Sequence, residues 1–160
     1  ADGLLHLLGG HQHQICQLVN DHHDLGQLFA AFGCYLEDAI SLSFSGEDAQ
    51  ARMAQTMQQL RQHPPRHLGS LPVVCWRDYK SGLCHSLTES ETKPLSLRGA
   101  DMVYYELAGG AALAIRPSGT EPKIKYYLLA HSHSRAQAME QLTSLRQAVP
   151  LPLNTDQAPA

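Results

Sequence analysis

The sequence predicts an α+β domain of two layers, in which an antiparallel sheet is flanked by two helices that cover one face. Two observations predict this fold. Short apolar runs typical of strands are interrupted by two stretches of helical period, in the order strand, helix, several strands and helix. The later strands follow one another across tight turns, the clearest of which contains Gly109-Gly110, and such turns join antiparallel neighbours. With 160 residues, of which 43% are hydrophobic, the chain suits one compact domain with appendages.

The first 34 residues predict two helices that precede this domain. The apolar period over residues 4–18 is interrupted by Gly9-Gly10, and each glycine costs about 1 kcal/mol of helix stability relative to alanine. A second helix follows a capping box at Asp24 and ends before Gly33. Histidines are dense here, but no carboxylate or thiolate shares a metal-ligand spacing with them, so we predict a solvated polar face and no metal site. These histidines are His6, His11, His13, His22 and His23.

The domain itself begins with a strand and a helix. Apolar residues alternate with serines over residues 40–44, as in a half-buried strand. Residues 45–48 then cap a helix that runs to about Arg61 and is stopped by Pro64-Pro65. The apolar residues that we predict on its buried side are Met53, Met57 and Leu60.

Three more strands are predicted before the most distinctive stretch of the chain. They cover residues 72–78, 102–107 and 111–115, and the last two form a hairpin. Residues 80–100 contain Ser, Thr, Glu and Gly without any period, so we predict an exposed loop there, with Arg98 solvated.

The most distinctive stretch reads Arg-Pro-Ser-Gly-Thr-Glu-Pro-Lys-Ile-Lys over residues 116–125. Apolar runs at 113–115 and 124–129 precede and follow its polar residues, which we therefore predict to lie on a loop held by two strands. Binding residues are often found on such loops.

Each residue type in this stretch suits a phosphate ester. The guanidinium of Arg116 is a planar fork that binds two phosphate oxygens at once. Gly119 lets backbone N–H groups come close to an anion, hydroxyl groups add donors, and the two lysines lie two residues apart on one face of the following strand. A carboxylate repels phosphate, so we expect Glu121 to brace Arg116 or a backbone amide. The candidate phosphate-binding residues are Arg116, Ser118, Gly119, Thr120, Lys123 and Lys125. From composition alone, a solvated basic turn without any ligand is the alternative.

After the strand at 124–129 the sequence predicts one more helix. Ser134 and Gln137 resemble its capping box, and apolar residues at helical spacing continue to Val149. His131 and His133 precede it, and we predict that both lie on the surface without a metal. Residues 150–160 contain two further prolines and no period, so we predict a mobile tail.

Composition excludes several functions. A formal charge of −3 and a pI near 6.4 leave no broad basic field for nucleic acid, so any phosphate chemistry must be local. The four cysteines show no C-x-x-C spacing and nothing resembles a signal peptide, which favours free thiols and a cytoplasmic location. No apolar run approaches the ~20 residues that span a bilayer, so we expect no membrane partner.

The stretch at 116–127 resembles the phosphate-binding signature in the last domain of the α-D-phosphohexomutases, the phosphoglucomutase and phosphomannomutase family. Shorter similarities extend the resemblance over about residues 2 to 149. They are Asp2-Gly3, Phe32-Gly33-Cys34-Tyr35, Leu60-Arg61 and Asp78-Tyr79 followed by Gly82.

The resemblance implies a domain organisation and a fold. Residues 1–34 would be a helical remnant of a preceding domain, residues 35–149 the phosphate-binding carboxy-terminal domain, and residues 150–160 a tail. The last domain of this family is similar to the TATA-binding protein, with a sheet flanked by two helices.

The resemblance also implies an activity. Family members shift phosphate reversibly between positions 1 and 6 of a hexose, through a bisphosphate of the glucose 1,6-bisphosphate type and an enzyme phosphoserine, with Mg²⁺ assisting. The present residues would hold the phosphate that is not reacting, and the partners would be a sugar phosphate and the upstream domains of the same chain.

The catalytic motifs of the family do not occur in this sequence. It contains no Thr-Ala-Ser-His-Asn-Pro-like run, no Asp-x-Asp-x-Asp magnesium loop and no Glu-rich sugar loop. We therefore expect a carboxy-terminal fragment that has no catalytic or metal-binding residues and is inactive alone. Two alternatives stay open: a phosphoglucosamine or acetylglucosamine phosphate mutase domain, whose loops are similar, and a non-catalytic anion-binding or interaction module.

Overall fold

The computed structural model describes residues 32–149. The predicted helix at 4–18, almost all of the predicted helix before Gly33, and the predicted tail at 150–160 lie outside the described residues. The histidines at the beginning of the chain lie outside them as well.

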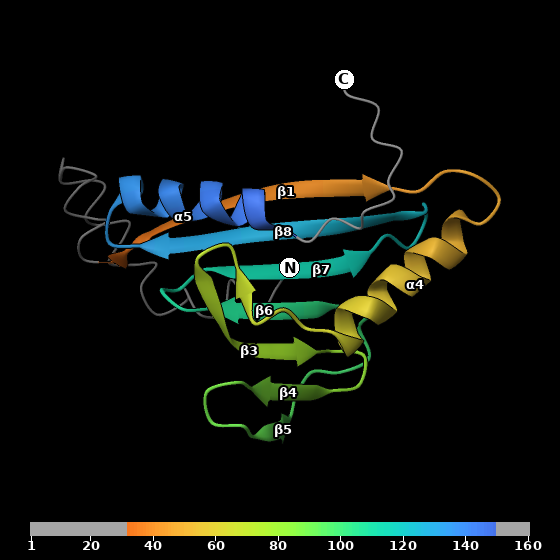
Figure 1. Ribbon diagram of the computed structural model, residues 1–160, viewed down its shortest axis with the longest axis horizontal. Helices are drawn as coiled ribbons and strands as arrows, with labels where there is room; N and C mark the ends of the chain where they lie inside the picture. The colour runs from red at the N-terminus through yellow and green to blue at the C-terminus, as the bar shows by residue number, and fades with distance from the viewer. Residues whose placement is uncertain (1–31, 150–160) are drawn as a thin grey trace, which may run out of the picture.

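The described residues form one antiparallel sheet with two helices on one of its faces (Figure 1). The sheet has eight strands in the order β1-β8-β7-β6-β3-β4-β5, and β2 pairs with β3. The strands are β1 (Cys34–Ser43), β2 (His67–Leu68), β3 (Leu71–Asp78), β4 (Leu83–Ser86), β5 (Thr92–Pro94), β6 (Val103–Leu107), β7 (Ala112–Pro117) and β8 (Lys123–Ser132). The predicted fold class, a two-layer α+β domain, is confirmed.

The two helices divide the sheet between them. Helix α5 (Arg135–Ala148) packs on β1 and β8, and helix α4 (Ala49–Gln62) crosses the other end of the sheet and contacts β7 (Figure 1). We call the face that they pack on the helix face and the opposite one the open face. Because side chains alternate along a strand, each strand sends every second residue to each face.

The core lies between the helices and the helix face. Leu113 and Ile115 of β7 and Ile124 and Tyr126 of β8 are fully buried there. The predicted buried side of α4 is confirmed, since Met53, Met57 and Leu60 all belong to this core. The hydroxyl of Tyr105 donates a hydrogen bond of 2.7 Å to the carbonyl of Leu60 and so satisfies one of the free carbonyls in the last turn of α4.

The helix starts follow the predicted caps only in part. Ser134 is the N-cap of α5, and its hydroxyl accepts a hydrogen bond of 3.3 Å from the amide of Gln137. The Gln137 side chain accepts from Ser132 and does not reach back to the cap. Asp48 precedes α4 but makes no side-chain cap; its carboxylate pairs with Arg52 at 3.3 Å.

Two strand predictions are wrong. The stretch at 80–100 is not a single loop, because β4 and β5 extend the sheet there. Both strands are short, β5 is the edge strand and β4 is its neighbour, and neither contains a fully buried residue, so no alternation of apolar residues marks them. The first strand begins at Cys34 and not near residue 40, and it pairs with β8 over its whole length.

Candidate phosphate-binding site

The predicted site residues lie on the β7–β8 hairpin, but the loop is shorter than predicted. Arg116 is on β7, Lys123 and Lys125 are on β8, and residues 118–122 form the turn between them. The prediction that Arg116 lies on the loop is wrong. The backbone of a strand residue is held more firmly than that of a loop residue. The sheet therefore fixes the position from which the Arg116 side chain extends.

Three cations of the hairpin project to the open face. Ile115 and Ile124 are fully buried on the helix face, so their neighbours Arg116, Lys123 and Lys125 point the other way. Arg116 and Lys125 are direct cross-strand partners. Side chains in such a pair are neighbours, so two positive charges stand side by side on β7 and β8.

Tyr127 holds the guanidinium of Arg116. One guanidinium nitrogen donates a hydrogen bond of 3.2 Å to the Tyr127 hydroxyl, and the central carbon lies 5.6 Å from the ring centroid. A tyrosine neither neutralises the guanidinium nor occupies all of its five donors. Arg116 is therefore oriented and still charged, with donors left for another anion.

Glu121 does not brace Arg116, contrary to the prediction. Its carboxylate forms an ion pair with Lys123. The hydrogen bond from Lys123 lowers the pKa of Glu121, and the charges of Lys123 and Lys125 lower it further. Lys123 is thus partly neutralised within the hairpin, whereas neither Arg116 nor Lys125 has a carboxylate partner among residues 32–149.

The turn leaves several donors unused. The amide of Ser118 donates to the carbonyl of Lys123 at 2.8 Å, which closes the turn, and the carbonyl of Pro122 accepts from the amide of Phe44 at 2.8 Å. Within residues 32–149, the three amides of residues 119–121 donate to no protein acceptor. The hydroxyls of Ser118 and Thr120 are likewise without a protein partner in the described part of the chain.

Gly119 has open space around it. A Cβ atom built there would meet nothing within 4 Å, and the residue does not have the positive φ that favours glycine. Neither packing nor backbone conformation in the described residues therefore requires glycine at this position. The space is available to a ligand that approaches the backbone closely.

Sequence reasoning missed three residues that lie next to the cations of the β7–β8 hairpin. Tyr127 closes the stretch at 116–127 that carries the family resemblance, but it was not predicted to contact Arg116. Ser41 and Ser43 on β1 lie directly opposite Lys125 and Lys123. Their alternation with apolar residues predicts that the serines share a face, but the pairing of β1 with β8 joins residues far apart in the chain and is not encoded locally.

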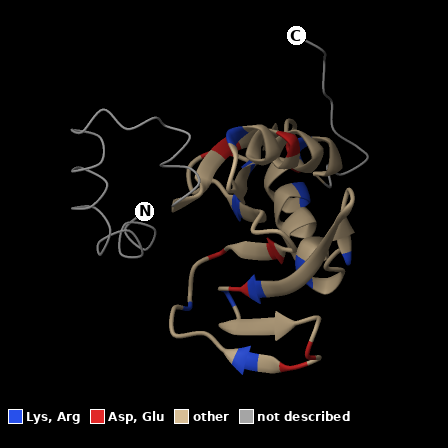
Figure 2. Ribbon diagram, turned by 90° about the vertical axis from the view of Figure 1, so that its left-hand side faces the viewer, with Lys and Arg blue, Asp and Glu red and all other residues tan. Residues whose placement is uncertain are grey.

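A second arginine on the open face provides a comparison. Tyr104 on β6 and Tyr127 on β8 flank Ala114, and the Arg77 guanidinium lies 5.5 Å from the centroid of the Tyr104 ring. Arg77 differs from Arg116 in one respect, since it forms an ion pair with Glu106. The other Lys and Arg residues are spread over several elements of the fold and do not gather on one of them (Figure 2). The positive charge of the β7–β8 hairpin is therefore not part of a wider basic region.

No family model matches the chain, but curated proteins do. A probable phosphoribomutase from Schizosaccharomyces pombe is 38% identical over 87 residues, which make up 53% of this chain and 15% of that protein. A phosphoglucomutase from Staphylococcus haemolyticus is 30% identical over 107 residues, or 67% of this chain and 19% of that protein. A phosphoglucomutase from Staphylococcus epidermidis is 31% identical over 96 residues, which make up 60% of this chain and 17% of that protein.

The chain is homologous to phosphoglucomutases and to a probable phosphoribomutase. The matched residues span less than a fifth of these curated relatives.

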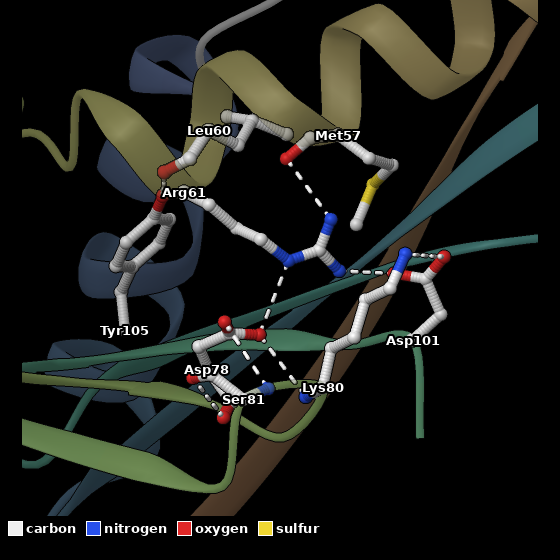
Figure 3. A network of polar contacts seen from close by, with 8 residues as sticks. All are labelled: Met57, Leu60, Arg61, Asp78, Lys80, Ser81, Asp101 and Tyr105. Carbon is white, nitrogen blue, oxygen red and sulfur yellow. Dashed lines mark hydrogen bonds and ion pairs between the residues drawn. The ribbon is translucent and has the colours of Figure 1, made fainter. Parts of the chain in front are cut away.

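A second polar cluster lies on the helix side of the sheet (Figure 3). The guanidinium of Arg61 at the end of α4 donates to Asp78 at 3.1 Å and to the Met57 carbonyl at 3.3 Å, and it pairs with Asp101. Asp78 also accepts from the amides of Lys80 and Ser81 at 3.0 Å and 3.3 Å.

This Arg61 cluster is a structural joint and not a binding site. A depression of about 330 Å³ lies beside it, lined by Ala54, Met57, Gln58, Arg61, Lys80 and Asp101. All three guanidinium nitrogens of Arg61 already have partners. The cluster therefore ties α4 to the turn after β3 and offers no free charge to a ligand.

The described residues contain no cluster of metal ligands and no helix that could cross a membrane. Within residues 32–149, no group of three or more His, Cys, Asp or Glu side chains is arranged to hold a metal ion. His131 stacks on Tyr35 with ring centroids 4.2 Å apart, and the ring centroids of His131 and His133 are 6.3 Å apart. No helix in the same part of the chain has the length and hydrophobicity that a membrane crossing requires.

Proposed function

We propose that this chain is the phosphate-binding domain of a sugar-phosphate mutase, and that the β7–β8 hairpin holds the phosphate that is not reacting. The observation that carries the proposal is the pair formed by Arg116 and Lys125, side by side on the open face and without a carboxylate partner in residues 32–149. The names of the relatives, phosphoglucomutase and probable phosphoribomutase, support the class of substrate.

The hairpin offers a phosphate several kinds of donor. Arg116 binds two oxygens through its planar fork, and Lys125 adds a point charge. The free amides of residues 119–121 and the hydroxyls of Ser118 and Thr120 supply directed hydrogen bonds. Lys123 remains close enough to contribute once its contact with Glu121 is exchanged for the ligand.

A phosphate clamp of this kind assists chemistry that takes place elsewhere. Binding energy from the unreactive phosphate fixes the other end of the sugar in line with the reacting group. In the proposed reaction, phosphate moves between positions 1 and 6 of a hexose through a bisphosphate and an enzyme phosphoserine. A clamp that contacts only phosphate suits this reaction, because either end of the sugar must be able to occupy it.

The phosphoserine and Mg²⁺ of this reaction lie outside the proposed role of the hairpin. Mg²⁺ takes oxygen ligands, mainly carboxylates and water, whereas the hairpin has three cations and one carboxylate that is already paired. We therefore assign the hairpin to the substrate anion only. We also predict no mutase turnover by this chain alone, and a coupled assay with glucose 1-phosphate checks this; turnover by the pure chain would contradict it.

Calorimetric titration of the chain with glucose 1,6-bisphosphate at low salt tests the clamp. Arg116→Ala removes a charge-assisted contact, so we expect affinity to fall about 10- to 100-fold, or roughly 1.4 to 2.8 kcal/mol. Arg77→Ala is the matched control, because Arg77 has the same relation to a tyrosine ring but is paired with Glu106. Equal affinities for the wild type and the Arg116 variant would refute the clamp.

The identity of the sugar is a second question, because the relatives are named for different sugars. The probable phosphoribomutase has the higher identity, 38% against 30% and 31% for the two phosphoglucomutases above, which favours a pentose phosphate as a second candidate. Competition between ribose 5-phosphate and glucose 6-phosphate in the same titration compares them. If the hairpin recognises phosphate alone, the two sugar phosphates should displace the bisphosphate equally well. A strong preference for one of them would show that this domain also contacts the sugar.

A further inference from the structure

Two cysteines lie against each other on the open face, away from the phosphate hairpin. Cys75 is on β3 and Cys84 is on β4, and their sulfur atoms are 2.9 Å apart. In the ladder Cys75 faces Ser86 and Arg77 faces Cys84, so the two cysteines occupy a diagonal of the strand pair. Side chains on such a diagonal are within reach of each other.

Both thiols are partly accessible and share a polar surrounding. Cys75 and Cys84 are half-buried, whereas Cys34 is buried at 2% exposure on β1 at the other end of the sheet. Arg77, the direct partner of Cys84, also pairs with Glu106, which lies opposite Cys75. An oxidant from solvent can therefore reach one sulfur while the other stays in contact with it.

We propose that Cys75 and Cys84 form a redox-reversible dithiol, which peroxide converts to a disulfide between β3 and β4. Hydrogen peroxide oxidises one thiol to a sulfenic acid, and one water leaves. The second thiol attacks the sulfenic sulfur, the S–S bond forms, and the hydroxyl group leaves with the thiol proton as a second water. Two thiols and one peroxide thus give one disulfide and two waters, and a dithiol reductant reverses the change by thiol–disulfide exchange.

The surroundings determine the pH at which the pair reacts. Burial, followed by the neighbouring Cys84 and the charge of Glu106, raises the pKa of Cys75 to about 12, against the smaller opposing effect of Arg77. Cys75 is therefore a thiol at neutral pH, and thiolates are the reactive form. Closure should therefore become faster as the pH rises, because a larger fraction of the thiol is ionised.

The disulfide would fasten one particular hairpin. The β3–β4 turn begins at Asp78, which is tied to Arg61, and β5 is paired with β4. A bond from Cys75 to Cys84 encloses this turn and limits the opening of the β4–β5 edge. Transient disulfides of this kind are the form in which thiol pairs of reducing compartments sense oxidants.

The test is oxidation of the full chain with a small excess of hydrogen peroxide at pH 8, followed by mass spectrometry under non-reducing conditions. We expect a loss of about 2 Da and a fall of about two in the number of titratable thiols, from the four in the sequence, both reversed by dithiothreitol. Trypsin cleaves after Arg77 and Lys80, between the two cysteines, so only a disulfide keeps the peptides that contain them together.

Cysteine-to-serine variants provide the controls. Cys75→Ser and Cys84→Ser should each abolish the loss of mass and accumulate a sulfenic acid that dimedone traps, whereas Cys34→Ser should behave as the wild type. Amide spectra of each variant establish that it is folded. The proposal is overturned if the wild type accumulates dimedone adducts without the loss of mass, or if the linked peptides contain Cys16 or Cys34 in place of this pair.

Discussion

At the scale of single residues, two arginines of the open face differ in whether a carboxylate pairs with them. Arg116 and Arg77 each lie over a tyrosine ring, at 5.6 Å and 5.5 Å from its centroid. The difference is Glu106, which pairs with Arg77, while the carboxylate nearest to Arg116 in the chain, Glu121, pairs with Lys123. The partner of each charge, and not its residue type, therefore decides which arginine is left without a carboxylate in the described residues.

Substitution of Gly119 separates the fold from the proposed function. Because a Cβ atom there meets nothing within 4 Å and φ is not positive, Gly119→Ala should leave stability unchanged or raise it by up to about 1 kcal/mol. The same methyl group occupies the space next to the free amides, so we expect weaker binding of glucose 1,6-bisphosphate. Thermal unfolding and calorimetry measure the two effects.

Gly82→Ala is the control for that substitution. At Gly82 φ is +74° and a Cβ would lie 3.0 Å from the Cβ of Arg98, so this variant should lose stability. Unchanged bisphosphate affinity of Gly119→Ala would mean that the ligand does not approach the turn backbone.

Two buried tyrosines should respond in opposite ways to loss of the hydroxyl. Tyr105→Phe removes the hydrogen bond to the Leu60 carbonyl and leaves that carbonyl unpaired, which costs about 1 to 2 kcal/mol of unfolding free energy. The Tyr126 hydroxyl has no partner among residues 32–149, so Tyr126→Phe should be neutral or stabilising by about 1 kcal/mol. Urea unfolding of both variants tests this, and the reverse order would contradict the hydrogen-bond assignment.

At the scale of elements, the Arg61 cluster joins three parts of the fold. It links the last turn of α4 to the β3–β4 turn through Asp78 and to the segment before β6 through Asp101. The side chains of Arg61 and Asp78 are only 15% and 9% exposed. The cluster therefore fixes where the β3–β4–β5 edge lies relative to α4.

Removal of Arg61 should be costly. Arg61→Ala leaves the carboxylate of Asp78 buried without its cation, and the loss of one partner of a buried pair costs on the order of 3 kcal/mol. Arg98→Ala, on the exposed part of the same edge, should change stability by less than about 0.5 kcal/mol. Similar effects of the two substitutions in denaturant unfolding would show that the cluster does not join these elements.

The same cluster predicts a dependence on acid. Burial alone would raise the pKa of Asp78, but hydrogen bonds from Ser81, Arg61 and Lys80 outweigh it and hold the pKa below the ordinary value of 3.8. The ionised form thus stabilises the fold above about pH 4, and this contribution is lost as the pH falls through the lower, folded pKa.

Unfolding free energies of the wild type and Asp78→Asn from pH 7 to pH 2 measure that contribution. The advantage of the wild type should be constant near neutral pH and shrink below about pH 4. An advantage that stays the same down to pH 2 would show that Asp78 does not titrate as described.

At the scale of the whole molecule, the sequence predicts the parts of the fold that are buried. The helix starting after Asp48, the helix starting after Ser134 and the hairpin at Gly109-Gly110 are marked by period, caps or turn chemistry, and all three are present. The short strands β4 and β5, at the β5 end of the sheet, are absent from the prediction because strands without fully buried residues need no alternating pattern.

The residue types of the candidate site can be read from the sequence, but their arrangement in space cannot. The stretch at 116–125 indicates a phosphate ligand because its charges and turn residues are local in sequence. The contact of Tyr127 with Arg116 and the pairing of Ser41 with Lys125 depend on strand register, which long-range packing fixes. Likewise, only the ladder brings Cys75 next to Cys84.

The most direct test of the central claim is an amide NMR titration of the chain with glucose 1,6-bisphosphate at low salt. We predict shifts that saturate and are confined to residues 116–125 and to the facing part of β1 around Ser41 and Ser43, and that Arg116→Ala abolishes at the same concentrations. Shifts centred on the depression beside Arg61, or shifts that survive in the Arg116 variant, would contradict a phosphate clamp on this hairpin.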